Sequence, residues 1–365
     1  MMKKLPLGIQ AIDKVLGKGE YIYVDKTSYI KKLIDGDSPH YFMSRPRRFG
    51  KSLFVSTVEE IFKGNKKLFE SCAIYQSAYD WKPHPVLHFD FALIAHQSPK
   101  ALKAGLQDLL EDIAKKYGLS VTGSSLQSQL TRLVRTLAEQ YRPVVVLVDE
   151  YDKPIINHLT DLDTAKQNRD ILSDFFGTLK GLDTHIRFTF ITGVSKFSQV
   201  SLFSGLNNLT DITMDEAYSG MMGYTEDEVK SYFHPYIEAI ASKQSNSAGS
   251  VLEEVREWYN GYRFSKSPVS IYNPFSTLNY MARGTPKSYW YRTGTPSFLT
   301  AQMQKYPRNL APLSGTTASE NALMDISSLE HIDLTALMFQ TGYLTIHGFS
   351  GLDLYHLGFP NREVI

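Results

Sequence analysis

The sequence predicts an α/β protein in which helices cover both faces of a mainly parallel sheet, a three-layer αβα sandwich. Short apolar runs alternate with longer stretches of helical periodicity through residues 22–192, as in βαβ units. Residues 144–148 are five consecutive Val or Leu residues, which is typical of a strand buried on both faces. A turn that carries Gly-Lys-Ser links an apolar run to a helical pattern within residues 41–63. Together these observations favour a parallel sheet over other architectures.

The expected elements follow one another along the first part of the chain. A short apolar stretch covers residues 22–24. Strands are expected at residues 40–43, 86–91, 143–149 and 186–192, and helices at residues 27–34, 51–63, 100–117, 125–141 and 165–181. In chain order, one strand therefore comes between the strand before the Gly-Lys-Ser turn and the strand that ends in Asp149.

The segment at residues 41–52 has the layout of a phosphate-binding P-loop. It reads Tyr-Phe-Met-Ser-Arg-Pro-Arg-Arg-Phe-Gly-Lys-Ser. In such a loop backbone N–H groups cradle phosphates, the lysine (Lys51) reaches the outer phosphates, and the serine (Ser52) binds Mg²⁺. Arg45 stands where the first glycine of the motif is expected. Pro46 fixes its own φ and could replace the conformational role of that glycine.

A second motif lies about a hundred residues further on, where the apolar run 143–148 ends in Asp149 and Glu150. Acids at the carboxyl end of a parallel strand lie where open α/β sheets bind ligands. Asp149 is expected to hold Mg²⁺, and Glu150 to orient or deprotonate the attacking water. The alternative is a buried strand that happens to end in an acidic turn.

The strand expected at 186–192 ends in Thr192, and Ser195 follows shortly after. Either hydroxyl could lie beside the γ-phosphate as a sensor. Ordinary turn chemistry is the alternative, since Thr-Gly and Ser commonly end strands.

Several charged residues near these motifs admit more than one interpretation. The guanidinium groups of Arg45, Arg47 and Arg48 could neutralise phosphates, pair within the protein, or contact another subunit or a nucleic-acid backbone. The alternative is a solvated basic loop tip. Asp152 could support the metal shell or, as the safer expectation, pair with Lys153 on the surface.

Two further segments are also open to alternatives. The string Asp25-Lys26-Thr27 is either part of an adenine or docking region or a plain helix start. Arg263 is either a sensor arginine that reaches the γ-phosphate or, as the preferred interpretation, an arginine stacked on its aromatic neighbours.

The sequence changes character after Leu202. Helices are expected at residues 226–241, 251–259 and 276–281, with a small, polar linker at 242–250. We expect residues 1–215 to form the P-loop domain and residues 216–365 to form a mostly helical lid packed over the nucleotide site.

Composition sets bounds on the function. The chain has 365 residues, of which 42% are hydrophobic, and a net charge of +1, so any basic surface for nucleic acid must be local. Cys72 is the single cysteine, which fits a reducing cytoplasm. No signal-peptide core or membrane-length apolar run is recognised. His84 and His88 lie on an expected strand without metal spacing, so no zinc site is predicted.

Several strings resemble hallmarks of the AAA-ATPase-like family of bacterial P-loop ATPases. They are residues 23–27 (Tyr-Val-Asp-Lys-Thr), 44–52, 149–154 (Asp-Glu-Tyr-Asp-Lys-Pro), 192–198, 258–262 (Trp-Tyr-Asn-Gly-Tyr), 272–274 (Tyr-Asn-Pro), 342–345 and 358–364 (Gly-Phe-Pro-Asn-Arg-Glu-Val). The family is similar to this chain in having arginine at the position of Arg45. The resemblance implies an additional-strand, AAA-like fold, and it implies ATP binding more firmly than hydrolysis.

In proteins of this appearance the string 358–364 leads into a PD-(D/E)XK-type nuclease domain. No acid-plus-Glu-x-Lys core is recognised in this sequence, so no nuclease residues are assigned. The domain is expected to have been removed, or the chain to be a natural short form.

The sequence therefore predicts a Mg²⁺-dependent ATPase that drives or gates an appended nuclease-like domain or a protein partner. Lys51, Asp149 and Glu150 are the expected catalytic residues. The expected nucleotide-binding residues are Arg47, Arg48, Phe49, Gly50, Lys51, Ser52, Leu53 and Thr192, and Ser52 and Asp149 are the expected metal ligands. The alternatives are a nucleotide-sensing switch with little hydrolysis and a DNA-associated ATPase module.

Overall fold

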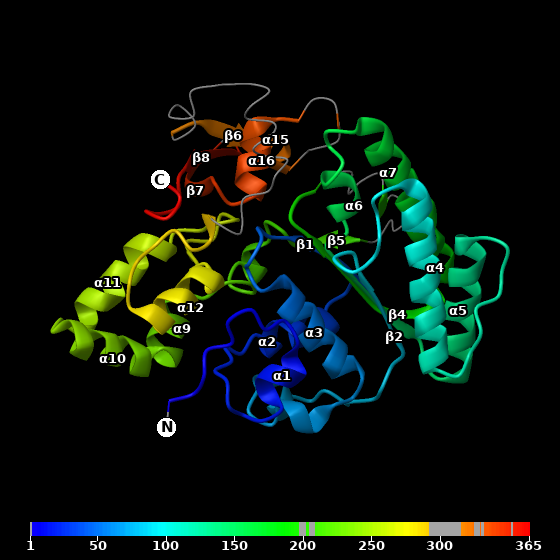
Figure 1. Cartoon of the computed structure of the whole chain (residues 1–365), viewed down its shortest axis with the longest axis horizontal. Coiled ribbons are helices and arrows are strands. Elements are labelled where there is room, and N and C mark those ends of the chain that lie inside the picture. The colour runs from blue at the N-terminus through cyan, green and yellow to red at the C-terminus, as the bar shows by residue number, and fades with distance from the viewer. Residues whose placement is uncertain are drawn as a thin grey trace.

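The centre of the molecule is a five-stranded parallel sheet (Figure 1). The computed structural model describes residues 2–196, 202–203, 209–291, 315–324, 329, 332–351 and 353–365. The strands are β1 (His40–Ser44), β2 (Val86–Asp90), β3 (Val144–Asp149), β4 (Ile186–Gly193) and β5 (Thr210–Asp211), in the order β2-β3-β4-β1-β5. The four longer strands lie where the sequence predicts them.

Helices cover both faces of this sheet, as expected. One face carries α1 (Ile12–Leu16), α2 (Thr27–Ile34) and α3 (Lys51–Phe62), and the other carries α4 (Pro99–Lys116), α5 (Leu126–Gln140) and α7 (Leu162–Gly177). Val145 and Leu147 belong to the core on the α3 side, whereas Val146 and Val148 belong to the core on the other side. The uninterrupted apolar run of β3 follows from this two-sided burial. The α/β fold with a P-loop layout is thus confirmed.

Shorter helical segments complete this part of the chain. They are η1 (Lys66–Phe69), η2 (Ala73–Gln76), α6 (Lys153–Ile156) and η3 (Thr178–His185). The helix expected at 165–181 is α7, which ends at Gly177 and continues as the 3-10 helix η3.

The spatial order of the strands differs from their order along the chain. In the sheet, β4 lies between β1 and β3, and β2 lies at the edge. All pairings are parallel, so the carboxyl ends of β1, β3 and β4 meet at one edge. Ser44, Asp149 and Gly193 end these three strands. The phosphate loop and the acidic turn are neighbours for this reason.

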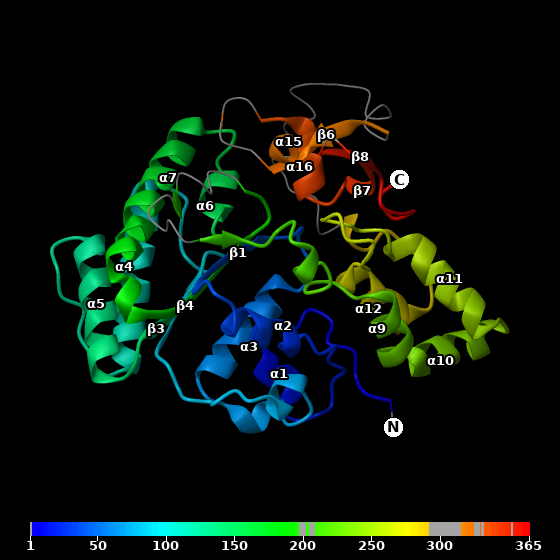
Figure 2. The same ribbon diagram turned by 180° about the vertical axis from the view of Figure 1, so that it is seen from behind.

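Four helices follow the sheet and form a separate group in Figures 1 and 2, namely α9 (Glu226–Tyr232), α10 (His234–Gln244), α11 (Ala248–Tyr259) and α12 (Pro274–Arg283). The prediction of a single helix at 226–241 is wrong. The helix ends before Phe233, and a second helix, α10, begins at His234 with Pro235 in its first turn. Proline donates no N–H to a preceding turn. The linker expected at 242–250 is also shorter, because only residues 245–247 separate α10 from α11.

The last part of the chain contains a sheet that the sequence reasoning missed. The strands β6 (Thr317–Ser319), β8 (Leu354–Gly358) and β7 (Thr345–Ser350) pair antiparallel in that order, next to α15 (Glu320–Met324) and α16 (Leu334–Gln340). These strands are short, and the glycines Gly348 and Gly358 interrupt the hydrophobic alternation that identifies a strand. The expectation of a mostly helical second part is incomplete in this respect. Among the described residues, no helix is both long and apolar enough to cross a bilayer.

Candidate nucleotide site

The loop between β1 and α3 curls around the ammonium group of Lys51. Its Nζ donates hydrogen bonds to the carbonyl oxygens of Arg45 and Pro46, each at 2.9 Å. Burial lowers the pKa of Lys51, and the nearby charges of Asp149 and Glu150 oppose that shift. Lys51 is also the first residue of α3. The N-terminus of this helix thus lies at the loop, which is where helices bind anions.

The backbone conformation explains why Arg45 can replace a glycine. Positive φ angles occur at Arg48 (68°) and Gly50 (89°) but not at Arg45. Only a left-handed conformation makes glycine strongly preferable to a residue with a side chain. The glycine at position 50 caps α3 in this conformation, so the conformational need lies at the end of the loop rather than at its start.

The three arginines of the loop have different environments. The buried Arg45 guanidinium lies 4.7 Å from the Phe264 ring, and its Nη1 donates to the carbonyl oxygens of Ser44 and Thr213. Burial lowers the pKa of Arg45 to about 9. Arg47 and Arg48 instead line a cavity at the loop. Structural pairing thus accounts for Arg45, and only the other two can face a phosphate.

Asp149 and Ser52 contact each other at the carboxyl end of β3. The Ser52 hydroxyl hydrogen bonds to the Asp149 carboxylate, which also accepts the Glu150 N–H at 3.0 Å. Burial raises the pKa of Asp149, and Ser52 and Lys51 oppose that shift. The two predicted metal ligands are therefore adjacent. Their hydroxyl and carboxylate oxygens are the hard donors that Mg²⁺ prefers.

Glu150 is held by a neighbouring cation. Its carboxylate accepts from Lys153 Nζ at 2.8 Å. Burial alone would raise the pKa of Glu150, but the hydrogen bond and charge of Lys153, together with Lys51 and Arg47, lower it. The backbone of Glu150 is left-handed, with φ at 53°, a conformation that costs about 1 kcal/mol in a non-glycine residue. Glu150 is also one of the residues that line the cavity.

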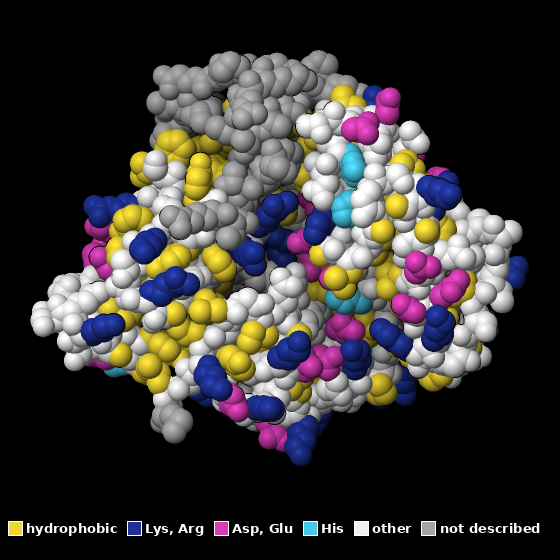
Figure 3. Space-filling view, in the orientation of Figure 1, with side chains coloured by type: hydrophobic (Ala, Val, Ile, Leu, Met, Phe, Trp, Pro, Cys, Tyr) yellow, Lys and Arg dark blue, Asp and Glu magenta, His cyan; other side chains and the backbone are white. Residues whose placement is uncertain are grey.

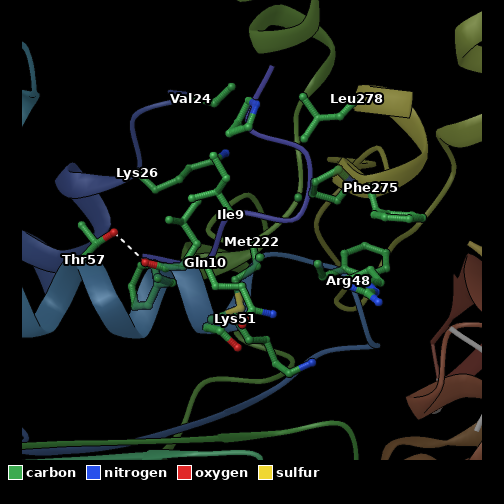
Figure 4. A pocket seen from close by; sticks show the side chains of 18 of the residues that line it. Ile9, Gln10, Val24, Lys26, Arg48, Lys51, Thr57, Met222, Phe275 and Leu278 are labelled. Carbon is green, nitrogen blue, oxygen red and sulfur yellow. Dashed lines mark hydrogen bonds between the residues drawn. The ribbon is translucent and has the colours of Figure 1, made fainter. Parts of the chain in front are cut away.

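The cavity has a volume of about 490 Å³ and two chemically different ends. Figure 3 shows Lys and Arg side chains gathered at a hollow near the middle of one face. The charged end is lined by Arg47, Arg48, Phe49, Gly50, Lys51, Ser52, Glu150 and Lys153, and the more apolar end by Pro6, Ile9, Ile22, Val24, Met222, Tyr224 and Leu278. The Phe275 ring lies beside the Arg48 guanidinium. Figure 4 shows Lys51 and Arg48 toward one side of the pocket and Val24 and Leu278 toward the other.

Two apolar residues that the sequence predicts to bind nucleotide, Phe49 and Leu53, also line the cavity. Leu53 lies in the first turn of α3. Phe49 is almost fully buried, and its ring packs edge-on against Tyr262 (4.9 Å) and Phe264 (5.8 Å). Phe49 therefore joins the phosphate loop to the second part of the chain while its surface faces the cavity.

The hydroxyl groups at the end of β4 make contacts within the protein framework. Thr192 Oγ1 donates to the Met43 carbonyl oxygen at 2.7 Å, and Ser195 Oγ donates to Asp152 Oδ2 at 2.8 Å. Thr192 does not line the cavity. These contacts correspond to the turn-type alternative rather than to a sensor position.

Asp152 is a buried framework residue, so the expected surface pair with Lys153 is wrong. Its Oδ2 accepts the N–H groups of Val194 (3.1 Å) and Ser195 (2.8 Å) and the Ser195 hydroxyl. Burial raises the pKa of Asp152, and the bonds from Ser195 oppose that shift. The acidic turn after β3 is fixed to the end of β4 by these bonds.

Arg263 follows neither of its two expected interpretations. Its guanidinium donates to the carbonyl oxygens of His347, Lys266 and Ser267, and it does not line the cavity. In the part of the chain that the structure describes, no aromatic ring lies under it.

Sequence reasoning missed most of the apolar end of the cavity. The signal was weak, because only the short apolar stretch 22–24 pointed to it. Both interpretations of the string Asp25-Lys26-Thr27 have a contact behind them. Asp25 Oδ1 accepts the Thr27 N–H at the start of α2 (2.8 Å), and Lys26 Nζ bonds to Glu228 (2.6 Å) and to the Gly220 carbonyl oxygen (2.7 Å). The bonds of Lys26 hold the N-terminal segment against α9.

One protein family matches more than half of the chain. The family model described as "Predicted AAA-ATPase" matches residues 6–203, which include the phosphate loop and the acidic strand. The chain belongs to this predicted AAA-ATPase family. Nucleotide binding is thus supported by both the family and the geometry of the loop.

The similarity to one curated relative extends further. The "Uncharacterized protein in vnfD 5'region" from Azotobacter chroococcum mcd 1 is 40% identical over 367 residues. The alignment covers 99% of this chain and 68% of the relative. The part of the chain after residue 203, which the family model leaves out, therefore has a counterpart in that protein.

Proposed function

We propose that this protein binds and hydrolyses ATP in a Mg²⁺-dependent reaction. The observation that carries the proposal is that Lys51, Ser52 and Glu150 line one end of a single cavity, where Ser52 also bonds to the buried carboxylate of Asp149. Positioning and charge stabilisation supply nearly all of the catalysis in phosphoryl transfer. The site offers both.

Each residue at the charged end has a defined task. Lys51 and the N–H groups at the start of α3 bind the phosphates. Ser52 and Asp149 would hold Mg²⁺, which supplies positive charge to the phosphate oxygens when bound. Glu150 orients a water molecule and accepts its proton. The water oxygen forms a bond to the γ-phosphorus, the bond from that phosphorus to the bridging oxygen breaks, and ADP leaves with the electron pair.

The apolar end of the cavity supports a nucleotide rather than inorganic phosphate. A cavity of about 490 Å³ lies in the range of small-molecule sites. Ile22 and Val24 from the N-terminal segment and Leu278 from α12 would contact the base. The polar Gln10 side chain lies between this end and Lys51 (Figure 4).

The same arrangement supports a lid function for the second part of the chain. Phe275 and Leu278 belong to α12 but line the cavity, so a bound nucleotide would contact both parts. We place the division near residues 215 and 216, between β5 and α9. Binding and hydrolysis would then change how the two parts pack, and this movement would drive or gate an appended domain or a partner.

The test compares wild type with Lys51→Met and Glu150→Gln. Steady-state phosphate release with Mg²⁺ gives turnover, and calorimetric titration with ADP gives binding. We expect Lys51→Met to lose nucleotide binding, and Glu150→Gln to bind but to turn over at least about 100-fold more slowly. Undiminished turnover by Glu150→Gln would exclude its role as the base.

A switch with little hydrolysis is the second candidate, and one observation favours it. Glu150 is tied to Lys153 at 2.8 Å, and this pairing keeps the carboxylate a weak base. Nucleotide that copurifies with the protein in the absence of turnover would support this candidate. The DNA-associated alternative loses part of its sequence support, because Arg45 is buried.

A further inference from the structure

Lys153 is a cation of the cavity that sequence reasoning assigned to a surface pair. It is the first residue of α6 and lines the cavity beside Glu150. Its Nζ lies 2.8 Å from Glu150 Oε2, and the two side chains are 28% and 30% exposed. The pair is therefore at the mouth of the charged end rather than on an open surface.

The backbone that carries Lys153 is anchored on both sides. Asp152 is bonded to the end of β4 through Val194 and Ser195. The carbonyl oxygen of Pro154 accepts from Asn168 Nδ2 of α7 at 2.9 Å. The long lysine side chain can thus change partner while its Cα remains in place.

The other cations near the loop have different constraints. The Lys51 ammonium is buried and bonded to two loop carbonyls, and the Arg48 guanidinium lies 5.0 Å from the Phe275 ring. Lys153 instead pairs with the Glu150 carboxylate, which carries negative charge as a phosphate oxygen does. A γ-phosphate that entered beside Glu150 would compete directly for this ammonium group.

We propose that Lys153 is a catalytic residue that leaves Glu150 for the γ-phosphate of ATP and stabilises the charge on it during hydrolysis. The inference rests on the proposed function. In the absence of ATP the Lys153 ammonium group occupies the Glu150 carboxylate. When Lys153 contacts the γ-phosphate, Glu150 is free to accept the water proton as the bond from water oxygen to phosphorus forms and the bond to the ADP oxygen breaks.

In some P-loop enzymes an arginine from another chain stabilises the charge on the γ-phosphate. In this proposal a lysine of the same chain has that role. A purely structural pair is the rival interpretation, because residues three apart at a helix start often pair without further function. The catalytic and the structural interpretations differ in whether the effect of replacing Lys153 depends on the γ-phosphate of the ligand.

The experiment uses the full chain with Lys153→Met and Lys153→Arg. Lys115→Met is the matched control, because Lys115 also pairs with an acid three residues away, Asp112, but on the exposed surface of α4. Affinities for ADP and for the non-hydrolysable ATP analogue AMP-PNP are measured by calorimetry with Mg²⁺, and turnover by phosphate release. Retained ADP binding shows that each variant is folded.

We expect Lys153→Met to bind ADP within about 2-fold of wild type, AMP-PNP about 10-fold more weakly, and to lose at least about 100-fold in kcat. Lys153→Arg should recover most of this loss, and Lys115→Met should match wild type.

Equal losses for ADP and AMP-PNP, or wild-type turnover by Lys153→Met, would overturn the inference and leave the proposed function intact. If wild type binds nucleotide without turnover, the AMP-PNP to ADP ratio still decides the role of Lys153. Failure of wild type to bind either nucleotide would instead reject the proposed function, and this inference with it.

Discussion

The indole Nε1 of Trp290 donates a hydrogen bond to the carbonyl oxygen of Arg47 at 3.0 Å. The backbone N–H of Trp290 donates to Glu363 Oε1 at 2.7 Å, and Ser276 Oγ of α12 donates to the same oxygen at 2.9 Å. One residue thus connects the phosphate loop to the string 358–364. Three family strings meet at this junction, because Asn361 Nδ2 donates to the Asn260 carbonyl oxygen at 2.7 Å.

Trp290→Phe should weaken nucleotide binding without unfolding the protein. The phenyl ring keeps most of the packing but removes the bond to the Arg47 carbonyl, which is worth about 1 kcal/mol. We expect ADP affinity to fall about 3- to 10-fold, measured by calorimetry. Trp258→Phe is the control, because Trp258 packs in the helical group and not at the loop. Equal affinities for wild type and Trp290→Phe would show that the bond does not support the loop.

Glu363→Gln should change the pH dependence of stability. Burial raises the pKa of Glu363 from 4.5 to about 7, against the opposing bonds from Trp290 and Ser276. The folded protein therefore binds this proton more tightly, so the stabilisation is fully present below pH 4.5 and is lost as the pH rises to about 7. The loss amounts to about 3 kcal/mol.

Urea unfolding at pH 5 and pH 8 measures this effect. Glu363→Gln should lose less stability than wild type between the two values, because its amide cannot ionise. The surface variant Glu139→Gln should behave as wild type. An unchanged pH dependence in Glu363→Gln would contradict the shifted pKa.

Asp152→Ala should be strongly destabilising, because it leaves the N–H groups of Val194 and Ser195 and the Ser195 hydroxyl without their buried acceptor. We expect the free energy of unfolding in urea to fall by about 3–5 kcal/mol. Asp152→Asn keeps an acceptor oxygen and should lose less. Asp161→Ala removes an exposed acid that caps α7 and serves as the control. A change below about 1 kcal/mol in Asp152→Ala would show that these bonds do not stabilise the fold.

Ile9→Trp tests the apolar end of the cavity. Ile9 lines that end and is only partly buried, so a larger ring can fill the space that we assign to the base. ADP affinity should fall at least about 10-fold, whereas inorganic tripolyphosphate should bind as it does to wild type. Leu93→Trp is the control, because Leu93 is 84% exposed. Equal weakening of both ligands would place the base elsewhere.

The catalytic core could be predicted because its signals are local in sequence. Gly50, Lys51 and Ser52 lie together at one helix start, and Asp149 and Glu150 end one apolar strand. Parallel strands then bring both ends to the same edge of the sheet. Little tertiary information was needed for this step.

The environments of neighbouring residues could not be predicted in the same way. Arg45 and Arg47 are two positions apart, yet one is buried against Phe264 and the other faces the cavity. Asp152 and Lys153 are adjacent, yet the first bonds to β4 and the second to Glu150. The sequence shows the charge of these residues but not which partner the fold places beside them.

By itself, the sequence determined the α/β class, the phosphate loop and the acidic strand end, since each depends on hydrophobic periodicity or on residues close together in the chain. Tertiary structure alone decided the apolar end of the cavity, the antiparallel sheet of β6, β8 and β7, and the junction at Trp290. The physical reason is that each of these is built from contacts between segments far apart in sequence, and such contacts leave no local pattern.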